Sequence, residues 1–172
     1  NLIKRAAYVN QLKDYVNTDF VKVYTGIRRS GKTSLMYNII DELKSMGVKD
    51  ENIIFISFES REYNQIDSSE KLDEIVYNKT ENIKGKIYLF FDEIQQVKGW
   101  EKSINSYRVS IDSDIYITGS NSKLLSGELA TLLTGRFLTI NVYPFSFKEF
   151  IQYKNEIEGV EINEYSIAKL YD

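Results

Sequence analysis

The 172-residue chain contains neither cysteine nor histidine, and it has a single proline. Without cysteine there is no disulfide framework and no thiolate metal site. Without histidine there is no imidazole for acid–base catalysis, and the commonest zinc ligand is missing. Any chemistry must therefore depend on carboxylates, lysine, arginine, hydroxyl groups and a bound metal ion.

Long apolar runs and an excess of positive charge are also absent. No apolar stretch approaches the roughly 20 residues that a membrane span needs, so we expect no membrane association. The 22 basic and 25 acidic residues give a net charge of −3, so no overall positive field favours nucleic acid. The length suits one domain. No signal-peptide pattern follows Asn1, and we expect a cytoplasmic protein or a trimmed chain.

The strongest positive signal is a glycine-rich motif near the N-terminus. Residues 26–33 read Gly-Ile-Arg-Arg-Ser-Gly-Lys-Thr, the GxxxxGK[ST] pattern of a phosphate-binding P-loop. The β-branched and aromatic run at 20–25 predicts a strand before it, and the helical spacing of apolar residues at 34–44 predicts a helix after it. This order suits the chemistry, because loop N–H groups and a helix N-terminus can replace the water that solvates phosphates.

The residues of this loop have expected roles in binding ATP. Glycine at 26 and 31 allows unusual φ values and a close approach of the backbone to phosphate. Lys32 is expected to reach the β- and γ-phosphates, and the Thr33 hydroxyl to ligate Mg²⁺. Arg28 and Arg29 lie over the nucleotide, face a partner, or are ordinary solvated loop residues. The expected nucleotide-binding set is Gly26, Ile27, Arg28, Arg29, Ser30, Gly31, Lys32, Thr33 and Ser34.

Strand patterns alternate with helical patterns along the whole chain. Strands are predicted at 20–25, 52–58, 87–91, 114–118 and 137–143, and helices at 1–17, 34–44, 69–83, 100–109, 122–133 and 146–154. Gly47 is a predicted helix C-cap, and Pro144 ends the last strand. The alternation predicts an α/β fold in which a five-stranded parallel sheet is flanked by helices. Ligands then bind at the carboxyl ends of the strands.

An acidic pair follows the third predicted strand. The apolar run at 87–91 leads directly into Asp92 and Glu93, which is the Walker B pattern. Asp92 is expected to hold Mg²⁺ through water, and Glu93 to orient the attacking water and accept its proton. A buried strand that ends in a charged turn produces the same pattern. The P-loop about sixty residues upstream favours Walker B.

The acidic pair, together with the absence of guanine-binding motifs, indicates which reaction and which nucleotide to expect. Small-molecule kinases must exclude water, whereas adjacent aspartate and glutamate favour hydrolysis. Residues 78–81 read Asn-Lys-Thr-Glu and so lack the aspartate of the guanine signature, and Asp92 does not begin an Asp-x-x-Gly motif. ATP and Mg²⁺ are therefore the expected ligands.

Polar residues near the last two strands are further catalytic candidates. Ser120 and Asn121 follow the fourth predicted strand. They are expected either to sense the γ-phosphate or the catalytic water, or to cap the next helix. Arg136 is either an arginine finger supplied in trans within a homo-oligomer or a surface residue in an ordinary ion pair. Apart from these candidates, Gln95 and Gln96 follow the acidic pair and contact either the water network or a neighbouring segment.

Taken together, several motifs resemble one family, the prokaryotic ATPases of the AAA type, over roughly residues 5–152. The motifs are residues 26–33, Asp-Glu-Ile-Gln at 92–95, Gly-Trp-Glu at 99–101, Thr-Gly-Ser at 118–120, Gly-Arg at 135–136 and Pro-Phe-Ser-Phe-Lys-Glu-Phe at 144–150. The resemblance implies a five-stranded parallel core, Mg²⁺-dependent ATP hydrolysis, a small helical lid and a further C-terminal domain. It also implies the usual roles for Lys32, Thr33, Asp92 and Glu93, and it favours Arg136 as a finger.

The chain departs from that family in its last part. Only 18 residues follow Lys154, too few for a lid and another domain, and no arginine follows Arg136 to act as a second sensor. We therefore expect an ATPase core over residues 1–154 and the start of a lid or linker over 155–172, with the lid mostly absent and the C-terminal domain missing. The expected function is ATP hydrolysis coupled to a conformational change in an attached or partner domain. The alternatives are an ATP-binding switch or scaffold with negligible hydrolysis, and a DNA-associated motor.

Overall fold

The structure, a computed structural model, describes residues 6–120, 124 and 135–144. Asn121 and the predicted helix at 146–154 lie outside the described residues, as does the expected lid or linker at 155–172. Of the predicted helix at 122–133, only Leu124 is described.

The described chain follows the predicted order of strands and helices. The helices are α1 (Ala6–Lys13), α2 (Lys32–Ser45), α3 (Ser69–Thr80) and α4 (Trp100–Ser110), with short 3₁₀ turns η1 (Asp50–Asn52) and η2 (Ile94–Gln96). The strands are β1 (Val21–Thr25), β2 (Ile53–Ser57), β3 (Ile87–Asp92), β4 (Ser113–Gly119) and β5 (Phe137–Asn141). In the part of the chain that the structure describes, no helix has the length and apolar character that a membrane crossing requires.

The ends of two helices differ from their predicted positions. The C-cap of α2 is Met46, one residue before the predicted Gly47. Gly47 follows it with a φ of 96°, and its N–H donates to the Lys44 carbonyl, as is typical of a glycine just after a helix end. The first helix ends earlier than the predicted residue 17. Residues 14–17 form turns, and Asn17 has a φ of 62°, in the left-handed region, which excludes it from a right-handed helix.

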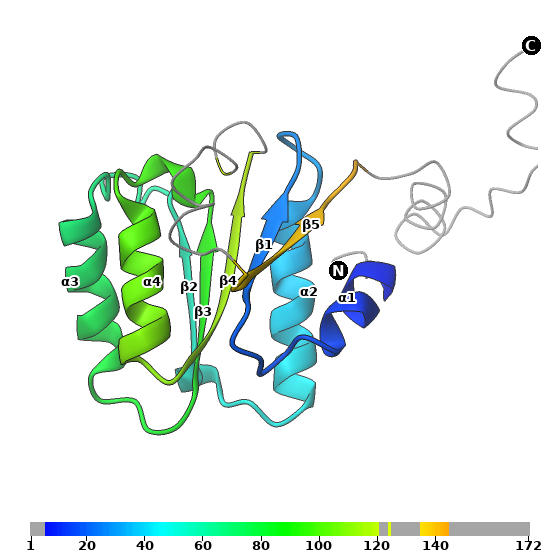
Figure 1. Cartoon of the computed structure of the whole chain (residues 1–172), viewed down its shortest axis with the longest axis horizontal. Coiled ribbons are helices and arrows are strands. Elements are labelled where there is room, and N and C mark those ends of the chain that lie inside the picture. The colour runs from blue at the N-terminus through cyan, green and yellow to red at the C-terminus, as the bar shows by residue number, and fades with distance from the viewer. Residues whose placement is uncertain (1–5, 121–123, 125–134, 145–172) are drawn as a thin grey trace, which may run out of the picture.

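The five strands form one parallel sheet in the order β2-β3-β4-β1-β5, which confirms the predicted fold class. β4 therefore lies between β1, which leads into the glycine-rich loop, and β3, which ends at Asp92. The carboxyl ends of parallel strands share one edge of the sheet, the upper edge in Figure 1. The loops that follow β1, β3 and β4 consequently meet at that edge.

Helices cover both faces of the sheet, α3 and α4 on one face and α1 and α2 on the other (Figure 1). Alternate residues of a strand point to opposite faces, so each strand supplies both cores. Leu89 and Phe91 of β3 pack with α3 and α4, whereas Tyr88 and Phe90 pack with α2. The result is a three-layer core in which β3 and β4 are buried on both sides.

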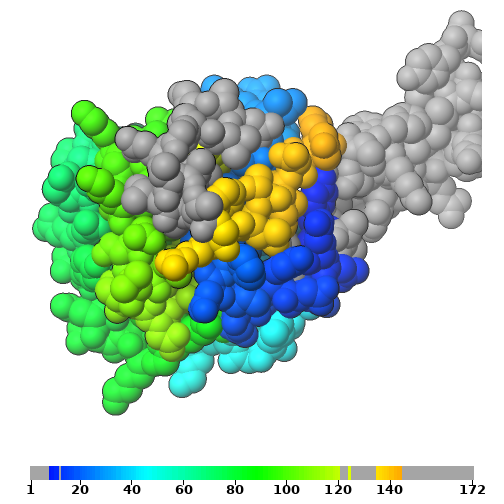
Figure 2. Space-filling model, in the orientation of Figure 1, coloured from blue at the N-terminus to red at the C-terminus, as the bar shows by residue number. Residues whose placement is uncertain are grey.

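β5 is an edge strand that pairs only with β1 among the described strands. Figure 2 shows it, in gold, at the surface beside the blue N-terminal residues. Its first three residues, 137–139, are partly exposed. Gly135 and Arg136, the described residues just before β5, are exposed and so accessible to a neighbouring molecule.

A buried ion pair lies near the amino ends of β1 and β4. The side chains of Lys22 and Asp114 are both 0% exposed and contact each other directly. The second carboxylate oxygen of Asp114 accepts hydrogen bonds from the Asn17 N–H (3.0 Å) and the Tyr116 hydroxyl (2.8 Å). Burial lowers the pKa of Lys22, and the charge of Asp114 opposes this shift. The pair joins the turn after α1 to the centre of the sheet.

Candidate functional site

The loop between β1 and α2 requires its two glycines for different reasons. Gly31 has a φ of 87° immediately before α2, which confirms the expected unusual conformation. Gly26 has no positive φ. A Cβ atom at Gly26 would lie 2.4 Å from the Val142 carbonyl oxygen and 2.7 Å from Ser30 Oγ. Glycine is therefore needed at position 26 for space, because the chain leaving β5 passes against the loop.

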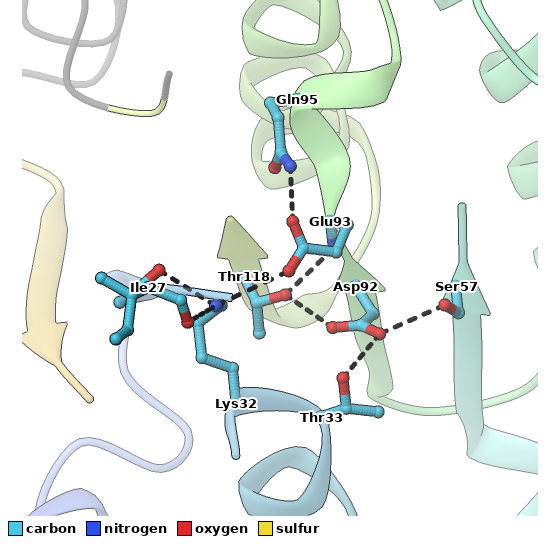
Figure 3. Close-up of polar contacts among 9 residues, drawn as sticks. Ile27, Lys32, Thr33, Ser57, Asp92, Glu93, Gln95 and Thr118 are labelled. Atoms are coloured by element: carbon cyan, nitrogen blue, oxygen red, sulfur yellow. Dashed lines mark hydrogen bonds and ion pairs between the residues drawn. The ribbon is translucent and has the colours of Figure 1, made fainter. Parts of the chain in front are cut away.

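Lys32 is the first residue of α2, and its side chain is only 4% exposed. Its ammonium group donates to the carbonyl oxygens of Gly26 (3.0 Å) and Ile27 (2.9 Å), as Figure 3 shows for Ile27. The same nitrogen lies 3.7 Å from Oε1 of Glu93. A buried cation at a helix N-terminus, enclosed by a glycine-rich loop, is suited to bind an anion such as phosphate.

Asp92 ends β3, is 3% exposed and accepts hydrogen bonds from three hydroxyl groups. Thr33 (2.9 Å) and Ser57 (3.1 Å) donate to Oδ2, and Thr118 (2.7 Å) donates to Oδ1. These hydroxyls come from α2, β2 and β4, so four elements meet at one carboxylate (Figure 3).

The oxygen atoms around Asp92 are the kind that Mg²⁺ prefers. Among the described residues there is no cluster of three acidic side chains that could hold a metal ion by itself. A magnesium ion in a P-loop site takes its remaining ligands from phosphate and water, so it does not need such a cluster. Thr33 and Asp92 therefore fit a magnesium ion that arrives with a nucleotide.

Glu93 follows Asp92 and is held at three points. Its backbone has a φ of 58° and a ψ of 49°, and its N–H donates to the Thr118 hydroxyl (2.9 Å). Its carboxylate contacts Lys32 through one oxygen and the Gln95 amide through the other. The side chain is 14% exposed, so it is partly shielded from water while still facing the loop.

An open cavity of about 470 Å³ lies over the loop. The lining residues are Arg28, Arg29, Ser30, Gly31, Lys32, Thr33, Ser34, Glu59 and Glu93. Seven of the nine expected nucleotide-binding residues therefore share one cavity with the expected base. The exposed Arg28 and Arg29 lie at this cavity, and Arg29 has a φ of 64°, which is uncommon for a residue other than glycine.

The remaining catalytic candidates are Ser120, Asn121 and Arg136. Ser120 directly follows β4, and its carbonyl accepts from the Leu124 N–H (3.1 Å), a spacing typical of a helix start. Asn121 lies outside the described residues. Arg136 is exposed, and its carbonyl accepts from the N–H of Val21, the first residue of β1. It therefore lies at the opposite end of the sheet from the loop that follows β1.

Sequence reasoning missed four residues of the site: Ser57, Glu59, Gln95 as a partner of Glu93, and Thr118. A signal was present for two of them. Ser57 and Thr118 are hydroxyl residues at or near the ends of otherwise apolar strands. Parallel strands end at one edge, so such hydroxyls are expected near the acidic pair once the strand order is known. Glu59 carried no comparable signal, because it lies in a polar stretch.

The fold and the site together define a nucleotide-binding domain of the P-loop class with an AAA-like core. A family model described as an AAA domain matches residues 18–151, and the chain belongs to this family. The family resemblance that the motifs indicated is thus confirmed.

Two relatives and one solved structure extend this finding. The chain is 45% identical over 170 residues to an uncharacterized protein of Haemophilus influenzae, covering 99% of this chain and 42% of that protein. It is 38% identical over 155 residues to an uncharacterized protein of Methanocaldococcus jannaschii, covering 90% and 33%. The chain therefore spans less than half the length of these relatives. AMPPCP-bound DnaA from Aquifex aeolicus has the same fold, with a TM-score of 0.63 at 17% identity over 99% of this chain and 56% of that chain.

Proposed function

We propose that this chain binds and hydrolyses Mg²⁺–ATP, and that hydrolysis changes the conformation of an attached or partner domain. The observation that carries this proposal is the meeting of four residues at one edge of the sheet: Thr33 donates a hydrogen bond to Asp92, and Lys32 forms an ion pair with Glu93. These four residues come from two segments far apart in the sequence, the start of α2 and the carboxyl end of β3 with the residue after it. No requirement of folding alone brings a buried ammonium, a hydroxyl and two carboxylates together at an open cavity.

In this proposal the loop and the first turn of α2 bind the phosphates. Backbone N–H groups and the Lys32 ammonium neutralise their charge, and the carbonyl contacts of Lys32 exchange for phosphate oxygens. Thr33 and Asp92 hold Mg²⁺, which, when bound, neutralises charge on the phosphate oxygens. Glu93 faces Lys32, so its carboxylate lies where it can orient water and accept its proton.

The coupling to another domain is supported by the length of the relatives. The matching region covers 42% and 33% of the two curated relatives, so each of them carries a longer region outside it. Domain closure and release are common uses of hydrolysis in sites that must exclude water.

The Thr33 hydroxyl offers a test of the magnesium site. Thr33→Val removes the hydroxyl at nearly constant size, and we expect phosphate release from ATP by the full-length protein to fall at least about tenfold. Thr33→Ser keeps the hydroxyl, so its rate of phosphate release should fall less. Chelation of Mg²⁺ with EDTA should abolish phosphate release in every variant. Turnover that persists in EDTA, or that is equal in Thr33→Val and the wild type, would contradict the assignment.

We also propose that Arg136 acts in trans, on ATP bound to a neighbouring subunit. Its backbone pairs with Val21, and β1 runs five residues from there to the loop. At about 3.3 Å per residue the strand places Arg136 roughly 16 Å from its own loop. The exposed position suits a contact with another subunit instead.

Arg136→Ala is expected to lower ATP turnover about tenfold and to leave ATP affinity largely intact, because the residue is remote from its own site. Arg61→Ala, another exposed arginine, is the matched control. Mixing Arg136→Ala subunits with Glu93→Gln subunits should restore part of the turnover, since some sites then combine an intact Glu93 with an intact Arg136. Failure of the mixture to recover any activity, with mixed oligomers present, would rule out a finger in trans.

A further inference from the structure

Gln95 contacts the expected base more closely than any other side chain that the structure describes. It lies in η2, and its side chain points back to Glu93 (Figure 3). Its amide nitrogen donates to Oε2 of Glu93 at 2.5 Å. Its amide oxygen is buried and has no hydrogen-bond partner among the described residues. A buried amide oxygen without a hydrogen-bond partner needs an explanation, because burying an unpaired polar atom is unfavourable.

The position of Gly119 explains why the amide stays in this orientation. A Cβ atom at Gly119 would lie 2.4 Å from the amide oxygen of Gln95 and 2.6 Å from the Leu124 side chain. The oxygen thus packs directly against the last residue of β4, where only glycine leaves room. Exchanging the amide oxygen and nitrogen would place an acceptor against the Glu93 carboxylate, which is unfavourable. The packing therefore confines the amide group, and the charge of Glu93 decides which of its two atoms faces the carboxylate.

This contact determines which oxygen of Glu93 faces the nucleotide-binding loop. Gln95 takes Oε2, and Oε1 lies 3.7 Å from the Lys32 ammonium. The backbone N–H is held separately by Thr118. Glu93 is thus anchored on the side away from the loop, and its second oxygen points into the cavity lined by the loop.

We propose that Gln95 is a positioning residue for the hydrolytic base: its amide holds one oxygen of Glu93 so that the other is presented to water beside Lys32. This inference rests on the proposed function, because it concerns the same site. Gln95 acts through Glu93 and does not touch ATP. Its loss therefore leaves the charge of the carboxylate in place but allows the group to rotate.

The test is single-turnover ATP hydrolysis by the full-length protein, with ATP affinity measured in parallel. Gln95→Ala should slow hydrolysis about 10- to 100-fold, because a small displacement of a reacting group has a large effect on rate. The dissociation constant for ATP should stay within about twofold. Gln95→Glu keeps the shape but replaces the donor with a second carboxylate, and it should be at least as slow. The adjacent and exposed Gln96 provides the control, since Gln96→Ala should match the wild type.

A double mutant separates positioning from a structural role. In the Glu93→Gln background, Gln95→Ala should leave the residual rate unchanged, because the carboxylate through which it acts is gone. A further loss of rate in that background would overturn the inference. Wild-type hydrolysis by Gln95→Ala would also overturn it, while slow hydrolysis by Glu93→Gln alone would still support the proposed function. A wild-type protein that does not hydrolyse ATP would overturn both.

Discussion

Glu93→Gln is expected to reduce ATP turnover about 10²- to 10⁴-fold while the protein still binds ATP. The substitution preserves the shape of the side chain but removes its capacity to accept a proton, together with the negative charge that faces Lys32. Lys32, Thr33 and Asp92, which are assigned to the phosphates and to Mg²⁺, keep their own contacts. Phosphate release and the binding of a fluorescent ATP analogue, both measured on the full-length protein, give the two quantities.

Glu70 supplies a matched control for this experiment. It is an exposed glutamate in the first turn of α3 and is not one of the residues that line the cavity over the loop. Glu70→Gln should therefore change turnover by less than about twofold. If Glu93→Gln hydrolyses ATP like the wild type, Glu93 is not the base. If the wild type binds ATP but releases phosphate no faster than a sample without protein, the protein is an ATP-binding switch and not a hydrolase.

Asp114→Ala is expected to lower the free energy of unfolding by about 3–5 kcal/mol, because it leaves the Lys22 ammonium buried without its counter-charge. Lys22 and Asp114 are both inaccessible to water, so no solvent can replace the lost partner. The Asn17 N–H and the Tyr116 hydroxyl lose their acceptor at the same time. Urea unfolding followed by circular dichroism measures the change.

Two aspartate variants test whether the buried charge is responsible. Asp112→Ala, just before β4 and exposed, should alter the stability by less than about 0.5 kcal/mol. Asp114→Asn keeps an acceptor oxygen, so its free energy of unfolding should lie between those of the wild type and Asp114→Ala. A loss for Asp114→Ala no larger than that for Asp112→Ala would show that Lys22 finds water or another partner when Asp114 is absent.

The local part of the nucleotide-binding site could be predicted because its residues are consecutive. Gly31, Lys32 and Thr33 are close in space since they are close in sequence, and their spacing is the motif itself. The acidic pair could be predicted for a related reason, because a buried strand places whatever follows it at the ligand-binding edge. For Gly26 the residue type was predictable but its reason was not, since the Val142 carbonyl that excludes a side chain lies more than a hundred residues away.

The contacts of Thr118 and Gln95 could not be predicted in the same way. The Thr118 hydroxyl reaches Asp92 because β4 pairs with β3, and strand order depends on how the crossover helices pack. Gln95 turns toward Glu93 because Glu93 has a left-handed φ and Gly119 leaves space beside it. Neither contact can be predicted from the spacing of residues along the chain.

The buried ion pair of Lys22 and Asp114 shows that a contact important for stability could not be predicted from the sequence either. Lysine in an alternating strand is expected to face water, because burial of an unpaired charge is costly. Only the pairing of β1 with β4 brings the two charges together and makes their burial tolerable.

By itself the sequence determined the class of this protein: periodic apolar patterns specify an alternating α/β chain, and a contiguous motif specifies the phosphate-binding loop. The tertiary structure alone decided which side chains from separate strands surround Asp92 and Glu93, and which end of the sheet carries Arg136. The physical reason is that local conformation follows from neighbours along the chain, whereas strand order and register follow from packing between segments that the sequence separates by many residues.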